Sequence, residues 1–108
     1  MANPYRGEVC LTVDGVDCAM RLSLGALAQL EVRLGAEGLL PLIERFETGQ
    51  FKADDLIALL WAGLSAAGWA GSEADLSKAE IAGGPMVAAR CAAQLLRLTF
   101  TLPESGDD

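Results

Sequence analysis

Residues 56–64 have the sequence L-I-A-L-L-W-A-G-L, nine consecutive positions without a charged side chain. Asp54 and Asp55 come directly before this stretch, and Gly68 follows shortly after it. A helix that crosses a bilayer needs about 20 apolar residues, so the stretch is too short for a membrane span. A helix that is apolar on all sides must be surrounded by other apolar groups. We therefore expect a helix that is either the centre of the core or covered on its outer side by another protein.

A β-hairpin is expected near the N-terminus. Asp14-Gly15 lies between two runs of alternating apolar residues, and an Asp-Gly pair favours a two-residue turn with positive φ. An isolated hairpin is marginally stable in water, so its apolar face must rest on helices or on strands of another chain. Centring the turn at Asp14-Gly15 predicts three pairs whose side chains share that face: Val13 with Val16, Leu11 with Cys18, and Val9 with Met20.

About five helices are expected after the hairpin, from apolar periodicity, capping residues and glycine or proline breaks. Ser23 can cap the first helix, and Pro85 can open the last one. Lys52 is a poor cap for the helix that holds residues 56–64. The expected helices cover about 24–34, 38–48, the region around 56–64, 74–82 and 85–102. The fold class is therefore α+β and mostly helical, in one domain at 1–108 with an ordered core at about 5–102 and an acidic tail at 103–108.

The periodicity also predicts which side of each helix faces the core. In the first two helices an apolar stripe should face inward, whereas the last helix should have one narrow polar stripe and be apolar elsewhere. The two apolar stripes are Leu24, Leu27, Leu30 and Leu34, then Leu39, Leu42, Ile43 and Phe46; the polar stripe is Arg90, Gln94, Arg97 and Thr101.

The charge of the chain limits its partners. The net charge is −7, from eight Lys and Arg against fifteen Asp and Glu, and the basic residues are scattered. Nothing in the sequence forms a basic stripe that could neutralise phosphates, so we expect neither direct nucleic-acid binding nor binding to an anionic membrane. The apolar content of 52% is high for a small domain. We therefore expect some apolar surface to remain outside the core, where a partner could cover it.

The sequence lacks a recognisable catalytic set. It contains no histidine, which a cysteine or serine nucleophile usually needs as its base. Cys10, Cys18 and Cys91 are odd in number and widely spaced, which fits neither a disulfide framework nor a zinc site. No secretory leader is evident, so a reducing cytoplasm is the expected location. We expect no enzyme activity, no metal and no cofactor, with Cys18 and Cys91 in the core and Cys10 as a free thiol on the polar face of the hairpin.

Three residues are candidates for contact with a partner protein: Trp69, Met86 and Leu98. Trp69 lies in an expected loop, where a tryptophan either folds back onto the core or anchors a partner. Trp61, by contrast, is expected in the core. The turn at residues 83–85 precedes a helix, which is a possible anion site, but it lacks the lysine of a phosphate-binding loop. We therefore expect an ordinary turn there.

From residue 5 onward, the chain resembles a small tail protein of gene transfer agents, which are phage-like particles of alphaproteobacteria. That family is also similar to the tail assembly chaperones of siphophages, and it has been labelled a tail tube protein. The resemblance continues through G-G-P-M into the last helix, and it has no catalytic residue to carry over. The strings that carry it are Y-R-G-E-V, L-T-V-D-G-V, M-R-L-S-L-G-A-L-A-Q-L-E, R-L-G, E-R-F-E-T-G and D-D-L-I-A-L-L-W-A-G-L.

The resemblance implies a role in building a tail through contacts with other tail proteins. As a chaperone in the producer cell, the chain would bind the helical tape-measure protein and, in some cases, tail-tube subunits. As a structural component it would stay in the particle, but a tube subunit should be dominated by strands, and this sequence predicts one hairpin and five helices. A small enzyme or ligand-binding module that uses Cys10 or the turn at residues 83–85 is a third alternative. Association of identical copies stays open.

Overall fold

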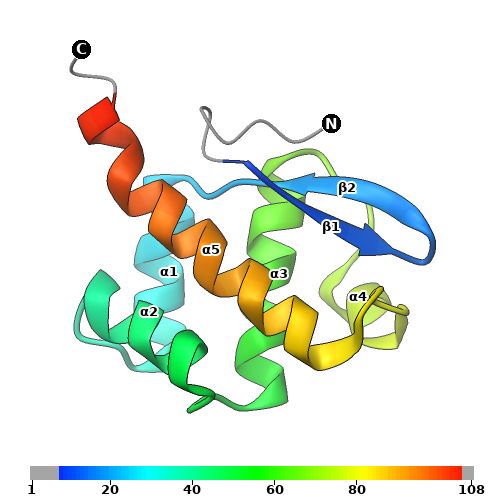
Figure 1. Ribbon diagram of the computed structural model, residues 1–108, viewed down its shortest axis with the longest axis horizontal. Coiled ribbons are helices and arrows are strands. Elements are labelled where there is room, and N and C mark those ends of the chain that lie inside the picture. Colours follow the sequence, from blue (N-terminus) through cyan, green and yellow to red (C-terminus); the bar gives the residue numbers. More distant parts are fainter. Residues whose placement is uncertain (1–7, 106–108) are drawn as a thin grey trace.

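A two-stranded hairpin and five helices make up the fold, in the order predicted from the sequence (Figure 1). The structure is a computed structural model; it describes residues 8–105, with side chains described up to residue 99. Residues 5–7 of the predicted core and 106–108 of the predicted tail lie outside this range. The elements are β1 (Val9–Val13), β2 (Val16–Met20), α1 (Leu24–Leu34), α2 (Leu39–Thr48), α3 (Ala53–Ala66), α4 (Glu73–Lys78) and α5 (Gly84–Ser105).

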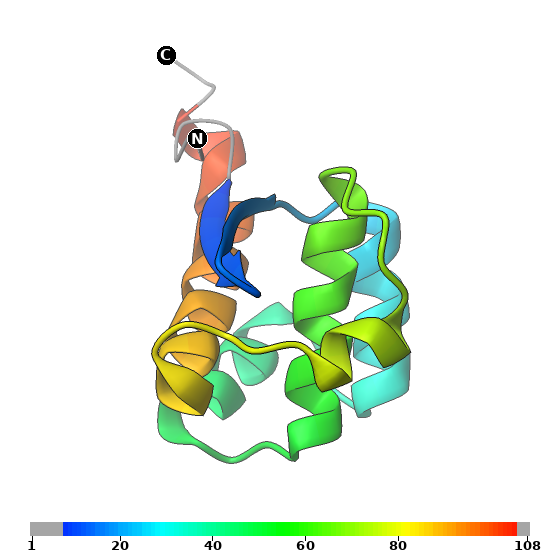
Figure 2. The same cartoon turned by 90° about the vertical axis from the view of Figure 1, so that its right-hand side faces the viewer.

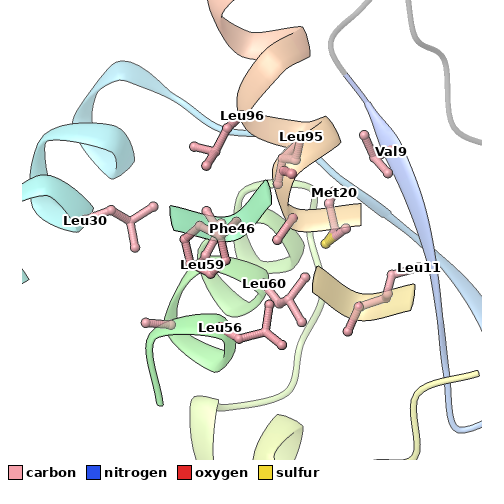
Figure 3. Packing of buried hydrophobic residues seen from close by; sticks show 14 of the residues in the cluster. Val9, Leu11, Met20, Leu30, Phe46, Leu56, Leu59, Leu60, Leu95 and Leu96 are labelled. Carbon is pink, nitrogen blue, oxygen red and sulfur yellow. The ribbon is translucent and has the colours of Figure 1, made fainter. Parts of the chain in front are cut away.

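Helix α3 is the central helix of the core. It contacts α1, α4, α5 and β2, and none of residues 56–64 is exposed. Leu59 and Leu64 are fully buried, and Trp61 is half-buried against the core, as predicted. Figure 3 shows α3 leucines meeting side chains from α1, α2, α5 and the hairpin. The sequence left open whether this helix is the centre of the core or is covered on its outer side by another protein. The structure shows the first alternative, because this chain itself surrounds the helix.

The predicted register of the hairpin is confirmed. Val9 pairs with Met20 and Val13 with Val16 across the turn. Asp14 (φ 51°) and Gly15 (φ 82°) have the positive φ angles that the tight turn requires. The hairpin lies across α3 and α5, because β2 contacts α3 and β1 contacts α5 (Figure 2). Val16 was expected on the covered face but is 62% exposed, because it adjoins the turn at the edge of the molecule.

The helix predicted at 74–82 is shorter than expected. Helix α4 ends at Lys78, and residues 80–82 run along the outer edge of β1 instead. The Asp14 N–H donates to the Glu80 carbonyl at 2.8 Å, and the Ala82 N–H donates to the Thr12 carbonyl at 3.1 Å. These bonds use backbone groups that a longer helix would need for itself. The hairpin thus gains a short third segment that local periodicity did not predict.

One residue of the predicted stripe on α1 points away from the core. Leu27, Leu30 and Leu34 are buried, but Leu24 is 84% exposed. Leu24 is the first residue of the helix, and Ala28 and Val32, which follow on its side of the helix at a spacing of four residues, are exposed as well. The predicted cap is present, because the Ser23 hydroxyl accepts a hydrogen bond from the Ala26 N–H at 3.1 Å.

Side chains of neighbouring residues complete the ends of the helices. At the start of α3, the Lys52 N–H donates to Asp55 Oδ2 at 3.1 Å, so a carboxylate one turn into the helix compensates for the poor cap. At the end of α1, Arg45 Nη1 donates to the Leu34 carbonyl at 2.6 Å. Because α1 ends on Gly35 in the left-handed conformation, this carbonyl has no partner within its own helix. Arg45 thereby joins α2 to the end of α1.

Helix α5 crosses the molecule and packs on α2, α3 and β1. It begins at Gly84, one residue before the expected Pro85, and extends to Ser105 rather than to about residue 102. Residues 103–105 of the predicted tail thus belong to the helix. The predicted polar stripe is confirmed for Arg90, Gln94 and Arg97, which are all exposed. The side chain of Thr101 lies outside the described residues.

Candidate functional site: a groove between α2 and α5

An open groove of about 710 Å³ lies between the C-terminal end of α2 and residues 85–97 of α5. Figures 1 and 2 show these two helices side by side on one face of the molecule. The residues from 46 to 51 form one wall, and residues of α5 from 85 to 97 form the other. Most of the lining is apolar, and its charged members are Glu47, Arg90 and Arg97.

Two phenylalanines form the aromatic part of the groove. Phe46 is buried at the end of α2, and Phe51 follows after the chain reverses at Gly49. Their ring centroids are 5.0 Å apart and the rings are inclined by 27°, which is a stacked arrangement. The stack links the core to the groove, because Phe46 also belongs to the buried cluster (Figure 3).

The wall formed by α5 is built from small and flexible side chains. Ala89 and Ala93 are one turn apart on the same side of the helix and both line the groove. Their small size leaves room for another chain to approach the α5 backbone. Met86 lies at the mouth of the groove and is 74% exposed. An unbranched, polarisable methionine adapts its shape to different apolar partners.

The rim of the groove contains an ion pair and a free arginine. Arg97 contacts both carboxylate oxygens of Glu47, with Nη2 to Oε1 at 2.9 Å, and so joins α5 to α2. The hydrogen bond from Arg97 lowers the pKa of Glu47, which therefore stays ionised at neutral pH. Arg90 is exposed on the same rim and has no recorded acidic partner among the described residues. The rim therefore offers one positive charge to a ligand.

The three residues predicted to contact a partner do not lie together. Met86 lines the groove, but Trp69 and Leu98 do not. Both are half-buried and pack against the core. The Trp69 ring lies so close to Gly71 that a Cβ atom there would be 2.4 Å from a ring carbon. Trp69 has thus folded back onto its own chain, which is one of the two alternatives considered for it.

Sequence reasoning missed most of the groove. Phe46 was assigned only to the core, and Ala89 and Ala93 have no distinctive chemistry of their own. A usable signal was present in the spacing of Met86, Ala89, Ala93 and Arg97, which recur every three or four residues on one side of α5. The facing wall comes from another helix and a loop, so only the tertiary structure shows that the two sides meet.

The cysteines and the glycine turn show ordinary structural environments. Cys10 is exposed, as predicted, while Cys18 and Cys91 are half-buried against the core. Burial raises the pKa of the Cys18 and Cys91 thiols, which lowers their thiolate fraction and so their reactivity. The Gly84 N–H donates to the Ile81 carbonyl at 3.0 Å, which closes the expected turn before α5.

The described residues contain neither a candidate metal site nor a helix suited to cross a membrane. No group of three or more His, Cys, Asp or Glu among them is placed to hold a metal ion. No helix in the described part of the chain combines the length and apolar character that a membrane crossing requires.

The comparison with known proteins agrees with the resemblance noted in the sequence. The model of a protein family described as "Phage tail tube protein, GTA-gp10" matches residues 6–101 of the 108-residue chain. No curated protein and no solved structure gave a match. The family match includes both strands and all of the residues that line the groove. The chain therefore belongs to the GTA-gp10 family of phage tail proteins.

Proposed function

We propose that this protein is a non-enzymatic tail assembly chaperone, which holds a helical segment of the tape-measure protein in the α2–α5 groove before the tail is built. The observation that carries the proposal is an open, mostly apolar groove on a helical protein of a tail family. An amphipathic helix commonly binds by laying its apolar face into such a groove. On this proposal the protein acts in the cytoplasm of the producer cell.

The fold favours a chaperone over a subunit of the tube wall. A closed wall of strands requires long strands whose edges are free to pair with neighbouring subunits. The described residues form two strands of five residues each. The outer edge of β1 is already in use near the turn, because residues 80–82 bond to Thr12 and Asp14. Little strand edge is therefore left for a ring of subunits.

The groove suits a helix that carries apolar side chains at i, i+3, i+4 and i+7. The stacked rings of Phe46 and Phe51 offer an apolar surface, and Ala89 allows a second backbone to come close to α5. Met86 can fold over the apolar side of the bound helix. Arg90 at the rim favours a segment with an acidic residue beside its apolar stripe.

Co-expression with the tape-measure protein of the same gene cluster tests the proposal. Affinity-tagged wild-type protein is expected to recover soluble tape-measure protein. Met86→Asp places a charge in the groove mouth, and Ala89→Trp fills the groove, so each should lower the recovery about tenfold or more. Leu40→Asp is the matched control, because Leu40 is 59% exposed and does not line the groove. Circular dichroism checks that each variant is folded.

Two results would count against the proposal. One is wild-type protein that recovers no tape-measure protein although both are soluble. The other is groove variants that remain folded and recover as much tape-measure protein as Leu40→Asp does, because the binding surface would then lie elsewhere.

A structural component of the tail is the second candidate, and the description of the matched family as a tail tube protein favours it. On that alternative the protein would stay in the finished particle in many copies. A chaperone, by contrast, leaves before the particle is complete. The composition of purified particles therefore separates the two candidates.

A further inference from the structure

The outer face of α1 carries the two most exposed large apolar side chains among the described residues. Leu24 is 84% exposed and Val32 is 83% exposed. Ala28, which is also exposed, lies midway between them. A spacing of four residues puts all three on one line along the helix, with about 6 Å between successive positions. We call these three residues the α1 stripe.

The α1 stripe is separate from the groove. No residue of α1 lines the groove, and Figure 2 shows α1 on the other side of α3 from α5. The buried face of α1, formed by Leu27, Leu30 and Leu34, packs toward the core, so the stripe is not needed for folding. An occupant of the stripe would therefore leave the groove open for the tape-measure protein.

The α1 stripe lies in a neutral part of the surface. A second copy, which carries the same negative charge, therefore meets less repulsion here than at most other places on this protein. The chain has a net charge of −7, so two copies repel each other. Residues 22–30 contain no charged side chain, and this neutral segment includes the first two turns of α1. Two copies that meet here bring few carboxylates together.

We propose that the α1 stripe is the interface of a homodimer in which two α1 helices pack antiparallel. A twofold axis beside Ala28 brings Leu24 of one copy against Val32 of the other, because both are one turn from the centre. The small side chain of Ala28 lets the two helices approach closely at the crossing point.

The antiparallel arrangement also complements the helix dipoles. The first turn of α1 has no acidic residue of its own to interact with its positive end. In the dimer, Glu31 of one copy lies beside the first turn of the other copy, close to Leu24. The first turn of each α1 helix is thus placed beside a negative charge from the partner helix, which its own first turn lacks.

The size of the stripe sets the strength of the dimer. One face of an 11-residue helix buries less surface than a standard stable interface. We therefore expect a weak, reversible dimer with a dissociation constant in the range of about 10 to 500 µM.

Sedimentation velocity of the full chain tests the inference without any tail partner. The wild type should pass from monomer to dimer over about 10 µM to 1 mM, as the expected constant requires. Val32→Asp should stay monomeric throughout, while Val16→Asp, a matched change at a 62% exposed valine on the hairpin, should dimerise like the wild type. A monomeric wild type at 1 mM, or a Val32→Asp dimer of unchanged strength, would overturn the inference.

Cross-linking tests the symmetry of the interface. In a Cys10→Ser background, which removes the exposed native thiol, Ala28→Cys should form a disulfide-linked dimer under mild oxidation, because two copies of residue 28 meet at the axis. Ala74→Cys, on the exposed side of α4, is the control and should cross-link far more slowly. Equal rates for the two variants would contradict the antiparallel geometry. Neither experiment involves the tape-measure protein, so its failure leaves the proposed function standing.

Discussion

At Gly63, α3 comes so close to its neighbours that a side chain there would force Leu95 and Met20 to shift. A Cβ atom there would lie 2.7 Å from Leu95 Cδ2 and 3.1 Å from Met20 Cβ, and both of those residues are fully buried. The Gly63 carbonyl also accepts the Arg21 N–H at 3.0 Å, which ties the end of the hairpin to α3. A glycine inside this apolar helix is explained by close packing and not by flexibility.

Gly63→Ala should therefore destabilise the protein by about 1–3 kcal/mol, because overpacking outweighs the gain in helix propensity. Gly25→Ala is the matched control, since the nearest atom to its new Cβ is Ser23 Oγ at 4.0 Å. The control should leave stability unchanged or raise it by up to about 1 kcal/mol. Urea unfolding followed by tryptophan fluorescence measures both. Equal stability of the two variants would refute the packing argument.

The ion pair between Arg33 and Glu73 should make a small, pH-dependent contribution to stability. Arg33 Nη2 lies 2.6 Å from Glu73 Oε2, and this hydrogen bond lowers the pKa of Glu73. A lowered folded-state pKa gives stability that is present above about pH 4.3, the ordinary value for Glu, and is lost as the pH falls through the folded-state value. Both side chains are partly exposed, which limits the effect.

Glu73→Gln should therefore lower the free energy of unfolding by less than about 1 kcal/mol at pH 7. The difference from the wild type should shrink as the pH falls from 5 toward 3. Urea unfolding across that range measures it, with Glu37→Gln as the control, because Glu37 is exposed and has no recorded ion pair among the described residues. A difference that stays constant with pH would show that the pair is not its source.

At the scale of elements, the attachment of residues 80–82 to the hairpin depends on Asp14. Its Oδ1 accepts the Glu80 N–H at 2.8 Å, and its own N–H donates to the Glu80 carbonyl at 2.8 Å. Asp14 also adopts a φ of 51°, which aspartate and asparagine tolerate better than most residues. One residue thus forms the turn and anchors the segment between α4 and α5.

Asp14→Ala should cost about 2–3 kcal/mol, because it leaves the Glu80 N–H without its acceptor and places alanine in a strained conformation. Asp14→Asn keeps an acceptor and the tolerance for positive φ, so it should cost less than about 1 kcal/mol. Faster hydrogen exchange at the Ala82 amide, with the rest of the core unaffected, should accompany the alanine variant. If both variants exchange alike at Ala82, the anchor lies elsewhere.

Elements that are determined by turn and capping residues close by in the sequence could be predicted. The Asp14-Gly15 turn fixes the hairpin register, because only one pairing puts the apolar side chains on a single face. The bounds of α1 follow from Ser23 and Gly35, which form its two caps. Residues 80–82 were assigned to a helix because their bonds go to β1, more than 60 residues away in the chain, and no local pattern reveals such a partner.

The candidate site was less predictable than the fold. Met86 could be proposed as a contact residue only as one of two alternatives, because an apolar residue of the last helix could equally belong to the core. The aromatic wall could not be predicted, since Phe46 satisfies the core pattern of α2 equally well. Leu24 was misassigned because its spacing from Leu27 suits a single apolar stripe, whereas it lies on the side of α1 that also carries the exposed residues Ala28 and Val32.

At the scale of the whole molecule, one chain presents two apolar surfaces on different sides of a compact helical core. The groove between α2 and α5 suits a helical segment from another protein, and the α1 stripe suits a second copy. The expectation that a chain with 52% apolar residues leaves apolar surface outside its core is confirmed. A dimer formed through the α1 stripe would carry two α2–α5 grooves, and could hold two segments of one long partner at once.

The composition of purified particles tests the central claim most directly. Quantitative mass spectrometry with isotope-labelled standards gives the number of copies of this protein per particle, relative to the tape-measure protein. A chaperone that acts before assembly predicts far less than one copy per particle, although the same protein is abundant in lysates of the producing cells. Many copies per particle, as a stacked wall requires, would contradict the account.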